Sequence, residues 1–178
     1  MGEIAFAATV SHAPGITGFR EAAGAQAERY YAGMAKLREA FEAAKPDAII
    51  EIFDDHFTNF YVDNMPAICV GVGGSHFGPA EEESFLKIPR GDVPGHPDLA
   101  RSLVREAFTA GFELSVSQRL LLDHGSMVPL HFVTPTMNVP SSVPPSPTKS
   151  PVPTGWPFAL ICVFERKNLR TLHRNHGR

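Results

Sequence analysis

The segment Ala48-Ile49-Ile50-Glu51-Ile52-Phe53 decides the fold class that the sequence predicts. Its run of apolar residues is typical of a strand buried inside a sheet. Apolar residues recur every three or four positions between about residues 19 and 44, which predicts a helix that Pro46 ends. Residues 4–10 form another short apolar segment before that helix. Strand, long helix and strand make a βαβ unit, so we expect two parallel strands in one sheet.

The α/β pattern continues as far as residue 137. Short apolar segments predict further strands at residues 67–72, 112–117 and 120–122. Pro97 suits the first position of a helix that runs to about residue 110. Residues 75–95 are rich in Gly, Pro and Glu and indicate a long surface excursion. We therefore expect an α/β fold, with an open, mostly parallel or mixed sheet flanked by helices.

The composition of the chain changes near residue 138. Every acidic residue except Glu165 lies before that point, and seven of the 16 prolines lie within residues 140–157. Proline lacks a backbone donor and fixes φ, so this stretch cannot form a helix or a central strand. We expect an α/β domain at residues 1–137, followed at residues 138–178 by a Pro-rich linker and a poorly ordered basic tail.

Composition also excludes several classes of protein. A formal net charge of −3 gives no general case for binding nucleic acid or an acidic membrane surface. Cys69 and Cys162 are the two cysteines of the sequence, too few for a disulfide framework or a four-thiolate zinc site. No apolar run approaches the roughly 20 residues that span a bilayer. We expect a cytoplasmic protein without nucleic-acid or membrane partners.

Three of the eight histidines follow strand-like segments directly. His12 follows the first strand, His56 follows the 48–53 strand, and His124 follows residues 120–122. Open α/β sheets place ligands outside the carboxyl ends of their strands, so three imidazoles can meet at one edge. Imidazole is the commonest metal-binding side chain and titrates nearest neutral pH. Each histidine, taken singly, also fits a turn residue or a hydrogen-bonded polar group.

The acidic residues beside these histidines have two interpretations each. Asp54 and Asp55 either support a site or form a turn. Asp123 either orients His124 by accepting its second N–H or is a plain surface carboxylate. Among the remaining histidines, His76 is expected in a solvated loop.

Four stretches, in order, resemble the class III extradiol ring-cleaving dioxygenases, the family of the protocatechuate 4,5-dioxygenase catalytic subunit. The resemblance covers most of residues 3–140, and its motifs are Ala8-Thr9-Val10-Ser11-His12-Ala13-Pro14-Gly15, Asp54-Asp55-His56-Phe57 with Phe60-Tyr61, Asn64-Met65-Pro66-Ala67-Ile68-Cys69-Val70-Gly71-Val72-Gly73, and Asp123-His124-Gly125 through Pro129-Leu130. It implies a non-haem Fe(II) enzyme that opens a catechol-type ring with O₂, next to one of the ring hydroxyls.

The resemblance also implies roles for individual residues. His12 and His56 match the two iron-binding histidines, and His124 matches an acid/base histidine near substrate and oxygen. We expect Asp55 and Asp123 to support these side chains, and we expect Fe(II) rather than zinc. The implied substrates are a small aromatic diol and O₂, and a homo-oligomer or a small partner subunit is compatible with the sequence.

The sequence departs from the family after about residue 140. The carboxylate ligand of the family lies in its C-terminal half, and nothing around Glu165 matches that motif. We expect a truncated chain that is inactive alone, with residues 138–178 read out of frame; a divergent short protein is the other interpretation. Two further functions stay open: a non-catalytic α/β binding or partner module, and a zinc hydrolase that uses His12, His56 and Asp54 or Asp55.

Overall fold

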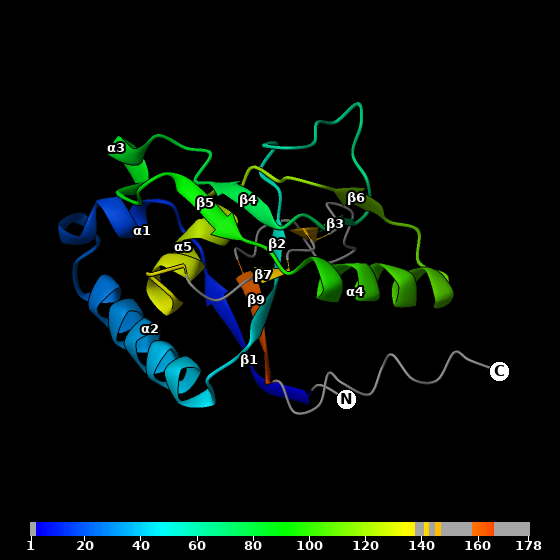
Figure 1. Cartoon of the computed structure of the whole chain (residues 1–178). Coiled ribbons are helices and arrows are strands. Elements are labelled where there is room, and N and C mark those ends of the chain that lie inside the picture. Colours follow the sequence, from blue (N-terminus) through cyan, green and yellow to red (C-terminus); the bar gives the residue numbers. More distant parts are fainter. Residues whose placement is uncertain (1–2, 138–140, 143–144, 147–157, 166–178) are drawn as a thin grey trace.

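The protein has the mixed α/β fold that the sequence predicts (Figure 1). The computed structural model describes residues 3–137, 141–142, 145–146 and 158–165. The strands are β1 (Glu3–Ser11), β2 (Ala48–Asp54), β3 (Cys69–Gly71), β4 (Ser75–Gly78), β5 (Gly91–Pro94), β6 (Ser115–Ser117), β7 (Ser141–Ser142), β8 (Pro145–Ser146) and β9 (Phe158–Glu165). The helices are α1 (Gly15–Gly18), the short 3-10 helix η1 (Arg20–Ala23), α2 (Gly24–Ala44), α3 (Glu83–Leu86), α4 (Pro97–Thr109) and α5 (His124–Val133).

The main sheet is built around β2. Its strand order is β1-β9-β2-β7, and β8 also pairs with β2. Strand β9 is antiparallel to both β1 and β2, so these two strands run parallel to each other, as the βαβ pattern predicts. They are not neighbours, however, because β9 lies between them. The pairing places Ala8 opposite Ile161 and Ile50 opposite Cys162.

The core explains why residues 48–53 read so clearly as a strand. Ile49 is fully buried and Phe53 nearly so, and the β2 residues between them are almost all buried. Helix α2 packs against β1 and α5 (Figure 1) and buries Ala27, Met34 and Phe41. Those three side chains repeat at helical spacing, which is the periodicity that predicts the helix.

The N-terminal helical region is divided where the sequence predicts one helix. Helix α1 and η1 precede α2, and Gly24 has φ +56° at the start of α2. A positive φ is costly for residues with a side chain, and glycine adopts it readily. The predicted helix after Pro97 is confirmed: α4 begins at Pro97 and is followed by Gly111 at φ +85°.

The prediction of a surface excursion at residues 75–95 is wrong. The segment contains β4, α3 and β5, and β4 and β5 pair as antiparallel strands. It buries His76, Leu86 and Val93, so the expectation of a solvated His76 is also wrong. His76 accepts a hydrogen bond at Nδ1 from the Leu120 N–H at 3.1 Å. The glycines and prolines that indicate a loop stand here at the ends of very short strands.

The strands predicted at residues 67–72 and 120–122 are confirmed only in part. Strand β3 occupies the centre of the predicted segment 67–72 and pairs in parallel with β6. Residues 120–122 form no strand of their own; Leu121 makes an isolated bridge with Phe77 of β4. Backbone hydrogen bonds still join Phe77 to both Leu120 and Leu122, which ties this segment to β4.

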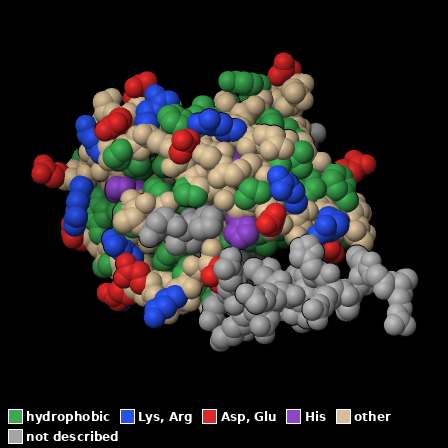
Figure 2. Space-filling model, in the orientation of Figure 1, with side chains coloured by type: hydrophobic (Ala, Val, Ile, Leu, Met, Phe, Trp, Pro, Cys, Tyr) green, Lys and Arg blue, Asp and Glu red, His purple; other side chains and the backbone are tan. Residues whose placement is uncertain are grey.

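The prediction of a linker and tail falls mostly outside the described residues. Within residues 138–178 the structure describes β7, β8 and β9, so the apolar segment after the prolines is a strand of the main sheet. Among the described residues, none of the helices combines the length and the apolar character that crossing a bilayer requires. Figure 2 shows acidic and basic side chains interspersed over one face of the molecule.

Candidate functional site

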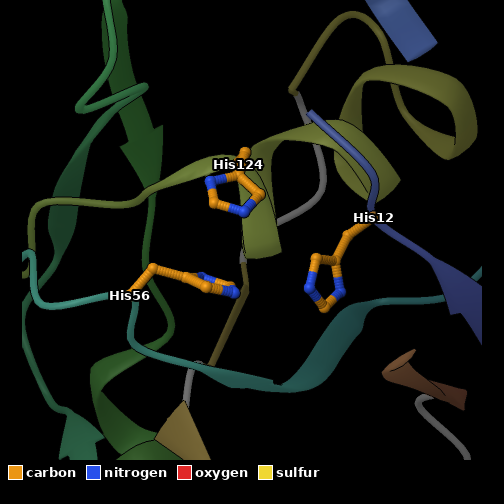
Figure 3. A group of neighbouring side chains, drawn as sticks. All are labelled: His12, His56 and His124. Atoms are coloured by element: carbon orange, nitrogen blue, oxygen red, sulfur yellow. The ribbon is translucent and has the colours of Figure 1, made fainter. Parts of the chain in front are cut away.

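Three histidines from distant parts of the chain meet at one point (Figure 3). His12 directly follows β1, His56 lies two residues beyond β2, and His124 is the first residue of α5. Each offers one ring nitrogen, and these nitrogens all lie within 4.8 Å of one another. The ring centroids are 4.1 Å apart for His56 and His124, and 5.2 and 5.7 Å from His12 to His56 and His124. The structure therefore brings together the three histidines that the sequence places at strand ends.

His12 is the most deeply buried of the three. It is 2% exposed, and no described residue forms a hydrogen bond with its Nδ1. The Tyr30 hydroxyl donates a hydrogen bond of 2.9 Å to the carbonyl of Ser11, which fixes the chain just before His12. Burial, followed by the nearby His56 and His124, lowers the pKa of His12 to about 4. His12 is therefore neutral near pH 7, the form in which an imidazole binds a metal.

His56 is held by Asp123. The Oδ2 atom of Asp123 accepts hydrogen bonds from the backbone N–H of His56 at 2.8 Å and from its Nδ1 at 3.2 Å. The hydrogen bond to Asp123, which outweighs burial, raises the pKa of His56 above its ordinary value. A carboxylate that engages one ring nitrogen fixes the tautomer and directs the other nitrogen outward.

Asp123 also begins helix α5. Its Oδ1 accepts a hydrogen bond of 2.7 Å from the Gly125 N–H as the helix N-cap, and the side chain is 1% exposed. Burial alone would raise the pKa of Asp123, but the hydrogen bonds from His56 outweigh it and lower that pKa. Both interpretations of Asp123 are wrong: the carboxylate faces His56 rather than His124, and it is buried rather than on the surface.

His124 is held by Glu81, a residue that the sequence analysis did not single out. The Oε1 atom of Glu81 lies 2.6 Å from His124 Nδ1 and 3.0 Å from the His124 backbone nitrogen. Burial tends to raise the pKa of Glu81, but the hydrogen bonds from His124 outweigh it and lower that pKa. In the sequence, Glu81 is the first of three consecutive glutamates, a pattern typical of a solvated surface.

Asp55 shapes the loop that carries His56. Its carboxylate accepts hydrogen bonds from the backbone N–H groups of Thr58, Asn59 and Phe60. The Asn59 side chain in turn pairs with both backbone groups of Leu121. Asp55 therefore acts as a turn residue, one of the two interpretations open to it, and links the loop to the segment before His124.

Strand β2 carries a buried carboxyl group, Glu51, which contacts helix α5. Glu51 is fully buried; its Oε2 accepts a hydrogen bond of 2.8 Å from the Ser126 hydroxyl, and its Oε1 has no partner among the described residues. Burial raises the pKa of Glu51 to about 8, so it is mostly protonated near neutral pH. The sequence offers no sign of this, because Glu51 reads as the polar interruption of an apolar strand.

The donor set fits a divalent metal ion. Three imidazole nitrogens suit iron, zinc and other first-row metals, and an unpartnered buried nitrogen on His12 is the kind of atom that a metal satisfies. Within the described part of the chain, no Asp or Glu oxygen belongs to the same close group. This argues against a zinc site that uses Asp54 or Asp55 as a direct ligand.

Comparisons with known proteins give one consistent result. Residues 6–154 match the model of a protein family described as the catalytic LigB subunit of aromatic ring-opening dioxygenase. Over 124 residues the chain is 29% identical to a 2,3-dihydroxyphenylpropionate/2,3-dihydroxicinnamic acid 1,2-dioxygenase of Klebsiella pneumoniae (strain 342). It is 28% identical, again over 124 residues, to the enzymes of that name from Escherichia coli O139:H28 (strain E24377A / ETEC) and Escherichia coli (strain K12 / DH10B). Each alignment covers 70% of this chain and 37% of the relative, so the chain spans well under half the length of these proteins.

Proposed function

Because this chain belongs to the family of the catalytic LigB subunit of aromatic ring-opening dioxygenases, we propose that its three histidines serve Fe(II)-dependent extradiol ring opening. In this proposal His12 and His56 bind the iron, and His124 is the acid/base residue. The observation that carries the proposal is the convergence of the three imidazoles from the ends of β1 and β2 and the start of α5. The substrates in this proposal are a catechol-type aromatic diol and O₂.

The two proposed iron ligands, His12 and His56, differ in burial and in their hydrogen bonds. His12 is neutral and shielded from water, so it binds a metal without first losing a proton. His56 is more exposed, but Asp123 holds its Nδ1 and leaves Nε2 free. When bound by His12 and His56, Fe(II) would supply open coordination positions for a catechol-type substrate and O₂.

His124 is well placed to exchange protons with such a substrate. Its ring centroid lies 4.1 Å from that of His56, and its side chain is 15% exposed. Its Nδ1 is engaged by Glu81, which leaves Nε2 as the atom that takes a proton from a catechol hydroxyl. A positioned acid/base side chain of this kind contributes about 10²–10⁴-fold to rate.

We expect the chain alone to bind a catechol but not to open its ring. Two histidines and one carboxylate are the ligand set of non-haem Fe(II) oxygenases. No carboxylate oxygen of the described residues joins the three imidazoles. Without a carboxylate ligand, the positions of substrate and O₂ would be poorly defined, and the advantage of positioning would be lost.

Anaerobic calorimetry with and without Fe(II) tests the proposal. Protocatechuate should bind the Fe(II)-loaded chain and not the metal-free chain, and 3,5-dihydroxybenzoate should bind neither, because its hydroxyls are not adjacent. Binding of protocatechuate without metal would contradict the proposal and favour a non-catalytic binding module. On exposure to O₂, the chain should give no yellow ring-opened product; abundant product would show that another group supplies the third ligand.

A further inference from the structure

The shortest hydrogen bond given by the three site histidines joins His124 to Glu81. A carboxylate accepts hydrogen bonds and does not donate them, so the 2.6 Å contact to Nδ1 requires the proton on that nitrogen. The same Oε1 atom accepts from the His124 backbone N–H at 3.0 Å. Two donors of one residue on one oxygen fix both the rotation of the ring and the place of its proton.

The consequence for the other ring nitrogen follows directly. In a neutral imidazole with the proton on Nδ1, Nε2 is an acceptor. Figure 3 shows one nitrogen of His124 turned toward His56 and His12 and the other turned away. Since Glu81 engages Nδ1, the nitrogen that faces the other two imidazoles is Nε2.

The fold places Glu81 beside His124 through the pairing of two segments. Phe77 bonds to Leu120 and Leu122, and the Ala80 N–H donates to the Leu122 carbonyl at 2.7 Å. This pairing brings residue 81 next to residue 124. It also requires Gly78, because a Cβ there would lie 2.8 Å from Met127 Sδ and 2.9 Å from Leu122 Cβ.

Glu81 differs from its two acidic neighbours. Its side chain is 22% exposed, and its Oε2 is buried without a hydrogen-bond partner among the described residues. Glu82 and Glu83 are exposed, and Glu82 precedes α3 without using its side chain as a cap. Glu81 also lies outside the close group of metal-binding nitrogens. Its contacts are to His124, so it acts on the site through that residue.

We propose that Glu81 is the positioning residue of His124: it engages Nδ1 and thereby turns Nε2 toward the proposed iron site. This inference rests on the proposed function only in naming His124 the acid/base residue. The pair parallels Asp123 and His56: each of the two partly exposed histidines has its own carboxylate.

The test uses nitrogen-15 NMR of the imidazole rings in the metal-free chain at a fixed pH above neutral. In the wild type, the two ring nitrogens of His124 should give well-separated signals, with Nδ1 protonated. In Glu81→Met, which keeps the side-chain length and removes both oxygens, the signals should move toward each other as the tautomers mix. Glu81→Gln should restore the wild-type pattern, because its amide oxygen can still accept from Nδ1. Glu82→Met is the matched control and should leave the pattern unchanged.

Three results would overturn the inference. The first is a wild-type His124 that carries its proton on Nε2, a measurement that requires no variant. The second is a Glu81→Met spectrum identical to that of the wild type. The third is a loss of Fe(II) affinity in Glu81→Met as large as that in His12→Ala, which would make Glu81 a ligand instead. Because the NMR measurement is made without metal, failure of the proposed iron site would leave its result standing.

Discussion

Asp123 Oδ2 accepts hydrogen bonds from both the backbone N–H and the Nδ1 of His56, at 2.8 and 3.2 Å, although the two residues are 67 positions apart. The same carboxylate caps helix α5 through the Gly125 N–H. One buried side chain therefore sets both the start of the helix that carries His124 and the orientation of His56. A substitution that keeps the helix cap but removes the contact to His56 can therefore separate these two roles of Asp123.

Asp123→Asn should weaken metal binding while the helix stays capped. Asparagine is as good an N-cap as aspartate, so the cap to Gly125 is retained. When the amide oxygen of asparagine caps Gly125, its NH₂ group faces the two His56 donors and cannot accept from them. Loss of such a support costs about 10–100-fold in metal affinity. Anaerobic Fe(II) titration measures the change. Asp92→Asn, at an exposed ion pair with Arg119, is the control and should bind like the wild type; equal affinity in both variants would contradict the role of Asp123.

Gly125→Ala should disturb the same contact by steric means. A Cβ at this position would lie 2.9 Å from Asp123 Oδ1 and 3.2 Å from His56 Cε1, tighter than ordinary contacts. We expect a loss of about 1–3 kcal/mol in the free energy of unfolding, as for other overpacked sites. Gly33→Ala, in helix α2 with open space around it, should instead stabilise the protein by about 0.5–1 kcal/mol. Urea unfolding of both variants measures the difference; equal shifts would contradict the prediction.

Glu51 makes stability fall as pH rises. Its pKa is about 8 in the folded protein and near 4.5 in the unfolded chain, so between these values the folded state keeps a proton that the unfolded chain releases. The stabilisation is fully present below pH 4.5 and is lost as pH rises toward 8, by about 1.4 kcal/mol per pH unit. Glu51→Gln removes this dependence and keeps an acceptor for Ser126.

The stability of Glu51→Gln relative to the wild type should therefore rise by about 4 kcal/mol between pH 5 and pH 8. Urea unfolding at the two values measures this change. Glu83→Gln, at an exposed position, is the matched control and should follow the wild type at both values. A constant difference between Glu51→Gln and the wild type would show that Glu51 does not hold its proton in the folded state.

The convergence of His12 and His56 could be predicted from sequence because each follows a strand with a clear apolar pattern, whereas His124 follows residues 120–122, which form no strand of their own. His12 and His56 come after apolar strands, and topology alone brings such strand ends together. Their carboxylate partners were not predictable, because a contact between residues 67 or 43 positions apart leaves no local signal. Asp123 stands next to His124 in sequence, and adjacency suggested the wrong partner.

In the fold, too, elements with a local sequence pattern were predicted, and pairings between segments distant in the sequence were not. The predicted helix over about residues 19–44 and the predicted strand over 48–53 have strong periodicity or a strong apolar run, and they correspond to α2 and β2, apart from the first residues of the helix. The insertion of β9 between β1 and β2 was not, because it depends on a pairing across more than 100 residues of chain. Strands β4 and β5 were missed because four residues are too few for an alternating pattern to stand out.

The most direct test of the central claim is the Fe(II) affinity of four proteins measured anaerobically: the wild type, His12→Ala, His56→Ala and His124→Ala. The proposal predicts that loss of His12 or His56 weakens binding at least as much as loss of a supporting carboxylate, by about tenfold or more. His124→Ala should bind iron nearly as well as the wild type, because its proposed role is proton transfer. His131→Ala controls for removal of a histidine as such, because His131 lies on the same helix as His124 but makes an edge contact with Phe132. Equal affinity of His12→Ala and the wild type would contradict the account.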